Sequence, residues 1–139
     1  MFFTKIKSVL FAFLVVLVLS CSKGGSDPNP PTPPAEENLS IGIDPDPGAE
    51  IAKTLGSSYD FKVLIKSKMP EKGVEGTVTF RKEFDNSLIS TQSISGTASP
   101  INVTISNIVL NEVGIVTIEL KSKSKPANTA SKTFKLARK

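Results

Sequence analysis

The residue types in this chain limit the chemistry that it can perform. Its 139 residues include one cysteine, Cys21, and neither histidine nor tryptophan. Without histidine, no Ser-His or Cys-His pair can activate a nucleophile, and the commonest transition-metal ligand is missing. A single cysteine also allows no disulfide within the chain. Cys21 is therefore the residue that points most directly to covalent chemistry.

Carboxylates are the remaining candidates for catalysis. A glycosidase-type mechanism requires two acids held across a cleft. The acids of this chain, such as Asp60, Glu75, Glu83 and Glu119, fall instead at expected solvent-facing positions or in turns. We interpret them as surface charge, and we predict that the protein is not an enzyme and has no catalytic residue and no cofactor.

Calcium is the one metal ion that the acid spacing suggests. Asp44, Asp46 and Glu50 could supply oxygen ligands of the kind that calcium prefers. Residues 45–48, Pro-Asp-Pro-Gly, explain the same segment as a turn. We favour the turn and predict no metal ligand.

Exposed aromatic rings would indicate sugar binding, because a planar ring can stack on a sugar face. Tyr59 and most of the eight phenylalanines fall in the N-terminal apolar segment or at positions expected to face a core. Phe84 is the one aromatic residue that we expect to be exposed. A surface glycan-binding protein is therefore the alternative function.

Basic residues gather at the C-terminus of a chain whose net charge is +4. From residue 121 onward there is no acid and there are seven bases: Lys121, Lys123, Lys125, Lys132, Lys135, Arg138 and Lys139. On a hairpin, Lys121, Lys123 and Lys135 would share the outward face and could meet an anionic glycolipid or an acidic partner. Lysines also protect exposed strand edges from aggregation, and we favour that interpretation.

An apolar segment precedes Cys21. The uninterrupted run from Val9 to Leu19 follows Lys5 and Lys7. It has about half of the roughly 20 residues that a membrane-spanning helix needs, and it has the length of a signal-peptide core. Its end, Val-Leu-Ser-Cys at residues 18–21, resembles the lipobox of bacterial lipoproteins. The resemblance implies a signal peptide at residues 1–20 and fatty acids, palmitate among them, on Cys21.

Residues 21–38 predict a linker. After Cys21 they contain two adjacent glycines, five prolines and no residue able to anchor a core. The glycines make the start of this segment flexible, and the prolines make the rest stiffer. The segment could span roughly 50 Å. Ser22 stands where many inner-membrane lipoproteins have aspartate, which favours the outer membrane and leaves its periplasmic or surface side open.

From residue 39 to residue 139 the hydrophobic period is two, which is typical of β-strands. Turn signals separate the apolar runs, and one weaker, more polar run at residues 88–94 suits an edge strand. The strongest runs lie at residues 39–43, 59–65, 78–80, 101–105, 116–120 and 134–136. About seven strands with one polar face each predict an all-β antiparallel sandwich. A single helical turn is expected only around Asn107–Glu112.

Two segments carry a resemblance to a family. Residues 44–63 and the closing hairpin at residues 113–136 resemble bacterial Ig-like domains. Together with Cys21 and the linker, the chain resembles the small Ig-like lipoproteins of Bacteroidota-type envelopes. The resemblance implies one Ig-like sandwich, held at the membrane through Cys21, with a non-catalytic binding or structural role. Its partner would be an envelope protein or a glycan, not nucleic acid, since the chain would be exported.

Overall fold

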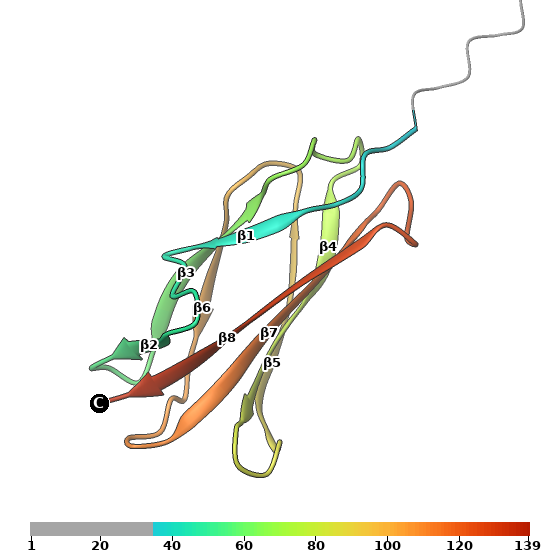
Figure 1. Ribbon diagram of the computed structural model, residues 1–139. Coiled ribbons are helices and arrows are strands. Elements are labelled where there is room, and N and C mark those ends of the chain that lie inside the picture. The colour runs from blue at the N-terminus through green and yellow to red at the C-terminus, as the bar shows by residue number, and fades with distance from the viewer. Residues whose placement is uncertain (1–34) are drawn as a thin grey trace, which may run out of the picture. The chain divides into compact units, whose positions relative to one another are not determined.

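The computed structural model describes residues 35–139. These residues form eight β-strands in two sheets (Figure 1). One sheet has the strand order β1 (Ile41–Asp44), β3 (Tyr59–Ile65) and β6 (Ile101–Ile105). The other has the order β2 (Ile51–Thr54), β8 (Thr129–Arg138), β7 (Val113–Ser122), β4 (Val74–Lys82) and β5 (Leu88–Gly96). The predicted signal peptide, Cys21 and residues 22–34 of the predicted linker lie outside the described residues.

This strand order confirms the predicted all-β sandwich. The strands β1-β3-β6 form one sheet, and β8-β7-β4 are the central strands of the other, with β5 beside β4 and β2 beside β8. All pairs are antiparallel except β2–β8, which is parallel. The eighth strand is β2, which the hydrophobic pattern missed because it has only four residues and follows the turn at residues 45–48.

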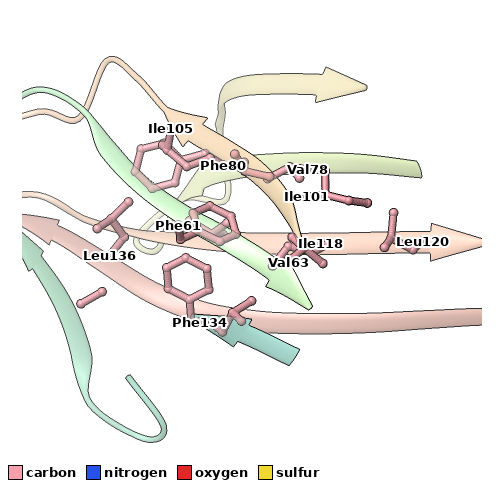
Figure 2. Packing of buried hydrophobic residues seen from close by; sticks show 14 of the residues in the cluster. Phe61, Val63, Val78, Phe80, Ile101, Ile105, Ile118, Leu120, Phe134 and Leu136 are labelled. Carbon is pink, nitrogen blue, oxygen red and sulfur yellow. The ribbon is translucent and has the colours of Figure 1, made fainter. Parts of the chain in front are cut away.

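The core lies between the sheets and follows the predicted alternation. Figure 2 shows Phe61 and Val63 of β3 facing Ile118 of β7 and Phe134 of β8. The Phe61 and Phe134 rings meet edge to face, with centroids 5.2 Å apart. Such pairs add stabilisation beyond the apolar area that they bury. The outward positions of the same strands carry mainly Thr, Ser, Lys and Glu, so the sandwich has a dry interior and polar outer faces.

The predicted helical turn at Asn107–Glu112 is wrong. These residues form an irregular loop between β6 and β7, in which Asn107 and Asn111 have positive φ angles of 63° and 58°. This left-handed conformation, which asparagine tolerates better than most residues, is incompatible with a continuing right-handed helix. Within residues 35–139, no helix is long and apolar enough to cross a membrane.

Two ends of the sandwich can be distinguished. At the proximal end (residues 35–39 and 122–128), the described chain begins beside the β7–β8 loop. At the distal end (residues 55–58, 83–88 and 106–112) lie the β2–β3 loop, the β4–β5 turn and the β6–β7 loop (Figure 1). The ten residues of β7 run from the distal to the proximal end, which separates the two by about 30 Å.

The proximal end is closed by a buried amide. The Asn128 side chain accepts a hydrogen bond from Leu39 N (2.7 Å) and donates to Glu36 Oε1 (2.7 Å) and to the Glu37 carbonyl (2.8 Å). Ser122 Oγ donates to the second Glu36 oxygen at 3.0 Å. Residues 35–38, which composition assigns to the linker, are thus part of the folded unit that runs from Ala35 to Lys139.

Candidate functional site

The β4–β5 turn places Phe84 at the distal end. Lys82 N donates to the Ser87 carbonyl at 2.9 Å, and Asn86 N donates to the Lys82 carbonyl at 3.1 Å. Asn86 closes the turn with a φ of 58°, a left-handed conformation that asparagine tolerates. The Phe84 side chain projects from this turn and is 99% exposed, as its position in the sequence predicts.

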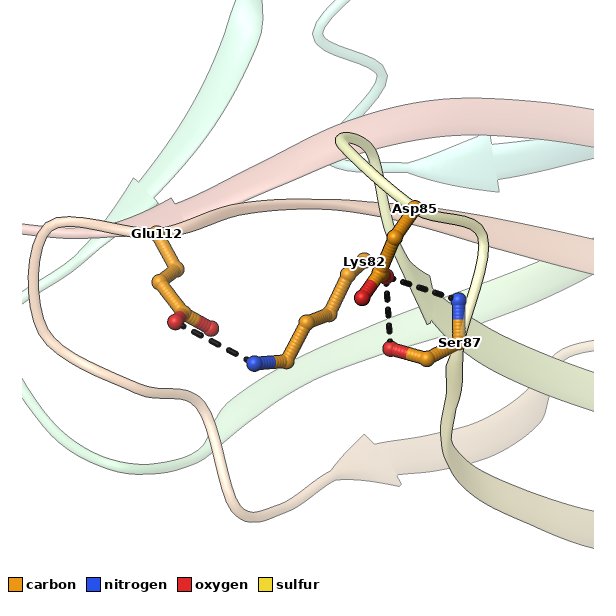
Figure 3. A network of polar contacts seen from close by, with 4 residues as sticks. All are labelled: Lys82, Asp85, Ser87 and Glu112. Carbon is orange, nitrogen blue, oxygen red and sulfur yellow. Dashed lines mark hydrogen bonds and ion pairs between the residues drawn. The ribbon is translucent and has the colours of Figure 1, made fainter.

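A carboxylate fixes the shape of this turn. Asp85 Oδ1 accepts hydrogen bonds from Ser87 Oγ at 2.7 Å and from Ser87 N at 3.0 Å (Figure 3). These bonds to Ser87 hold the pKa of Asp85 below its usual value, because they stabilise the charged form. The charged carboxylate therefore stabilises the turn at neutral pH, and the backbone of the turn holds Phe84 in its exposed position.

A hollow lies beside Phe84. Its volume is about 500 Å³, and it is lined by residues 82–85 and by residues 111–113. Glu83 N donates to the Val113 carbonyl at 3.0 Å, which joins the β4–β5 turn to the start of β7 and forms the floor between the two segments. A hollow of this size between an exposed ring and polar side chains can take a small polar group of a partner.

An ion pair crosses the hollow and leaves one acceptor unused. Lys82 Nζ lies 3.2 Å from Glu112 Oε1 (Figure 3). The other carboxylate oxygen, Glu112 Oε2, is buried and has no hydrogen-bond partner among the described residues. A buried acceptor without a donor costs about 1–3 kcal/mol. The two side chains are 39% and 41% exposed, so the accessible part of this pair can form further hydrogen bonds with a bound molecule.

The distal end also exposes apolar side chains outside this hollow. Residues 35–139 expose five large apolar side chains, and all of them lie there: Leu55, Phe84, Leu88, Val109 and Leu110. Arg138 links the loops that carry them, since its Nε donates to the Leu55 carbonyl at 3.4 Å and its backbone pairs with Leu110. The distal end therefore combines apolar contact area with the Lys82–Glu112 pair.

The sequence indicated the exposed apolar residues of the distal end only ambiguously. The run Ile108-Val109-Leu110 reads as core, yet only Ile108 is buried, and its N–H donates to the Ser57 carbonyl at 3.1 Å. Asparagines on both sides of the run, at residues 107 and 111, were the hint of a loop. The Lys82–Glu112 pair joins residues that are distant in the chain, and no local pattern indicates it.

The acids proposed as surface charge are where the sequence places them. Asp60 accepts a hydrogen bond from Thr104 Oγ1 at 2.6 Å, while Glu75 and Glu83 pair with lysines. Glu119 is exposed on the outer face of the five-stranded sheet. Asp60 and Glu83 lie apart from the other two, whereas Glu75 and Glu119 lie on the neighbouring strands β4 and β7 and line one hollow of about 920 Å³ on the outer face of the five-stranded sheet.

The calcium candidates form the predicted turn. Asp46 Oδ1 accepts a hydrogen bond from Gly48 N at 2.9 Å, and Oδ2 lies 3.2 Å from Lys132 Nζ. The Gly48 N–H, followed by Lys132, holds the pKa of Asp46 below its usual value. Asp44 and Glu50 are exposed, and no group of three metal-ligating side chains occurs in residues 35–139.

The basic hairpin does not form one cationic patch. Lys121 and Lys135 share the outer face, but Lys135 lies opposite Ile115, six residues and about 20 Å along β7 from Lys121. Lys121 pairs with Glu75 at 3.3 Å, and Lys135 pairs with Glu83. Protection of a strand edge is the wrong explanation for Lys121, because β7 lies between β8 and β4. Lys123 is exposed at the proximal end.

Comparison with known proteins adds no identification. No protein-family model matches the chain, and no curated protein matches it in sequence. The distal end is therefore assessed on its own chemistry. It offers an exposed ring, an acceptor without a donor and a lysine, which together suit non-covalent recognition.

Proposed function

We propose that this chain is a lipid-anchored cell-envelope protein whose Ig-like domain binds a partner without catalysis. One observation carries the proposal: the buried polar side chains of the proximal end, Asn128 and Ser122, are paired, whereas the large apolar side chains that residues 35–139 expose gather at the distal end. A domain held at its proximal end would present its distal end outward. Exposed large apolar side chains that gather at one end of a domain favour an interaction site there.

The anchor in this proposal is Cys21. Each buried methylene of an acyl chain contributes about 0.8 kcal/mol, and more than one chain makes membrane attachment stable. Palmitate-type acylation at Cys21, followed by the proline-rich segment, would hold the domain at the outer membrane. Replacing the thiol in Cys21→Ala should abolish incorporation of labelled palmitate. Unchanged labelling in that variant would contradict the anchor.

The recognition element in this proposal is Phe84. Aromatic residues in the centre of an interface commonly contribute most of its binding energy, because they bury a large area at small entropic cost. The Glu112 carboxylate and the Lys82 ammonium beside it can form directional hydrogen bonds to the same partner. An envelope protein is the partner that best suits several separated apolar side chains around one ring.

Photo-crosslinking in the native envelope tests this proposal. A photoreactive amino acid in place of Phe84 should capture a discrete partner, and the same group in place of Lys123, exposed at the proximal end, should not. Equal capture at the two positions, or capture at Lys123 alone, would contradict binding through the distal end.

A surface glycan is the alternative partner. It is favoured by the exposed Phe84 ring beside a hollow that the Lys82–Glu112 pair lines, because sugars offer both an apolar face and hydroxyl groups. A glycan array probed with the wild type and with Phe84→Ser decides this alternative. Glycan binding that is lost in the variant supports it, and an array without hits rules against it.

A further inference from the structure

One flank of the sandwich carries no charge. No acidic or basic residue occurs from Asn86 to Asn111, although 22% of the chain is charged. This uncharged flank (Asn86–Asn111) contains both β5 and β6, and each is the last strand of its sheet. All four ion pairs of the described residues lie outside it. The flank thus contributes no charged side chain of its own, although Asp60 contacts Thr104 and Arg81 contacts the Asn86 carbonyl.

The free edge of β5 lacks the usual protection of edge strands. Such strands avoid pairing with other chains through charged side chains, proline, shortness or bulges. β5 has nine residues, Leu-Ile-Ser-Thr-Gln-Ser-Ile-Ser-Gly, with no charge and no proline. Its register with β4 shifts only at its first residues, opposite Phe80 and Arg81. Its neutral, regular length is therefore available for strand pairing.

The other sheet edges are less suited to pairing. β1 contains Asp44 and β2 contains Lys53, and each has only four residues. The part of β8 that β2 leaves uncovered contains Lys132, which pairs with Asp46. β6 has five residues, and its Thr104 carbonyl already accepts a hydrogen bond from Gln92 Nε2 at 3.1 Å. β5 is the longest free edge of the described chain.

A row of threonines runs across the outer face and ends at this edge. Thr91 of β5 lies opposite Thr79 of β4, which lies opposite Thr117 of β7, which lies opposite Thr133 of β8. Hydroxyl pairs of this kind stabilise neighbouring strands. At β5 the row stops, with Thr91 and Ser93 exposed.

We propose that β5 pairs with β5 of a second copy of this chain, antiparallel and centred on Gln92, to form a continuous ten-stranded sheet. Centring on Gln92, the middle residue of the strand, pairs its whole length. Thr91 then lies opposite Ser93 of the other copy, so the threonine row continues across the dyad. Near the dyad of such a pair, a charged side chain would lie close to the same charge of the other copy, and β5 has no charge that could cause this repulsion.

Side-chain orientation agrees with this register. Gln92 lies opposite the buried Val78 and so points inward, whereas Thr91 and Ser93 point outward. A twofold axis perpendicular to the sheet places the core-facing sides of both copies on the same side of the joined sheet. This is required for two sandwiches to join without exposing either core. Because the paired strands are antiparallel, the distal ends of the two copies lie at opposite ends of the dimer. This inference does not depend on the proposed anchor or on Phe84.

Disulfide trapping tests the pairing in the full chain in detergent, in a Cys21→Ser background that leaves only introduced thiols. Opposed residues of antiparallel strands have Cα atoms about 4.5–5.5 Å apart, within the range that a disulfide bridges. The double variant Thr91→Cys/Ser93→Cys should form a covalent dimer on mild oxidation. The matched control Thr117→Cys/Glu119→Cys has the same spacing and outer face but lies on the central strand β7, and it should remain monomeric.

Sedimentation of the full chain completes the test. The wild type should sediment as a dimer, and Thr91→Lys/Ser93→Lys, which adds like charges across the dyad, should sediment as a monomer with unchanged circular dichroism. Thr117→Lys/Glu119→Lys should remain dimeric. A monomeric wild type would overturn the proposal, and pairing of β5 with a strand of another protein would then be the alternative. A dimer that both lysine variants retain would overturn it as well, because another surface would then hold the copies together.

Discussion

The proximal and distal ends of the sandwich differ in how far their polar side chains are paired and their apolar side chains are buried. At the proximal end, Glu36 uses both carboxylate oxygens, on Asn128 and on Ser122. At the distal end, Glu112 uses one oxygen on Lys82 and keeps the other buried without a donor. The proximal end also buries Leu39, whereas the distal end exposes Phe84. Complete pairing indicates a structural role, and incomplete pairing beside exposed apolar groups indicates a binding role.

The largest effect on stability is expected at the proximal end. Asn128→Ala removes three side-chain hydrogen bonds and leaves the buried Leu39 N–H without an acceptor. We expect the free energy of unfolding to fall by about 2–4 kcal/mol. In a domain of this size the midpoint of thermal unfolding moves by about 4–8 °C for each kcal/mol. Urea and thermal unfolding measure both, and a loss below about 1 kcal/mol would contradict a structural role for this amide.

A smaller effect is expected at the ion pair of the distal end. Lys82 and Glu112 are both partly exposed, so the pair should contribute no more than about 1 kcal/mol. Glu112→Gln loses the pair but also removes a charged oxygen that has no donor. Glu75→Gln is the matched control, because Glu75 pairs with Lys121 at similar exposure. Urea unfolding should show Glu112→Gln to be no less stable than Glu75→Gln. A clearly larger loss at Glu112 would assign it a structural role.

The smallest effect is a local dependence on pH at the β4–β5 turn. The folded-state pKa of Asp85 is lowered, so its stabilising effect is present above its unfolded pKa and is lost as the pH falls through the folded value. The amide resonance of Ser87 should therefore stay constant through the ordinary carboxylate range and shift only at lower pH. Asp85→Asn should abolish this titration. A Ser87 resonance that titrates at an ordinary aspartate pKa would show that the turn does not hold the carboxylate.

Local pattern predicted much of this molecule. Alternation identified the core positions of β3, β4, β7 and β8, and the polar character of residues 88–94 identified β5 as an edge. These features depend on neighbours within one strand, where a period of two is decisive. Phe84 was predicted to be exposed for another reason, its position at the end of its strand, and it is 99% exposed.

Long-range pairing accounts for what the sequence did not predict. The Asn128 network joins residues about ninety positions apart, and composition alone placed Glu36 in the linker. The lysines of the β7–β8 hairpin look like a cationic patch until Glu75 and Glu83 of the β4 region are placed beside them. The positive φ angles at Asn107 and Asn111 turned an expected helical turn into a loop. The partners of Asn128 and of the lysines are not visible within a short window of sequence, whereas the asparagines at residues 107 and 111 were a local hint of the loop.

Retention on isolated envelopes tests the central claim most directly. In a Cys21→Ala background, which removes the proposed lipid, the chain can be retained only through its domain. Phe84→Ser should leave the free energy of unfolding within about 0.5 kcal/mol, because the side chain is 99% exposed, and should reduce retention at least roughly tenfold. Lys123→Ser, the control at the proximal end, should be retained like its parent. Equal retention of the Phe84→Ser and Lys123→Ser chains would contradict recognition through the distal end.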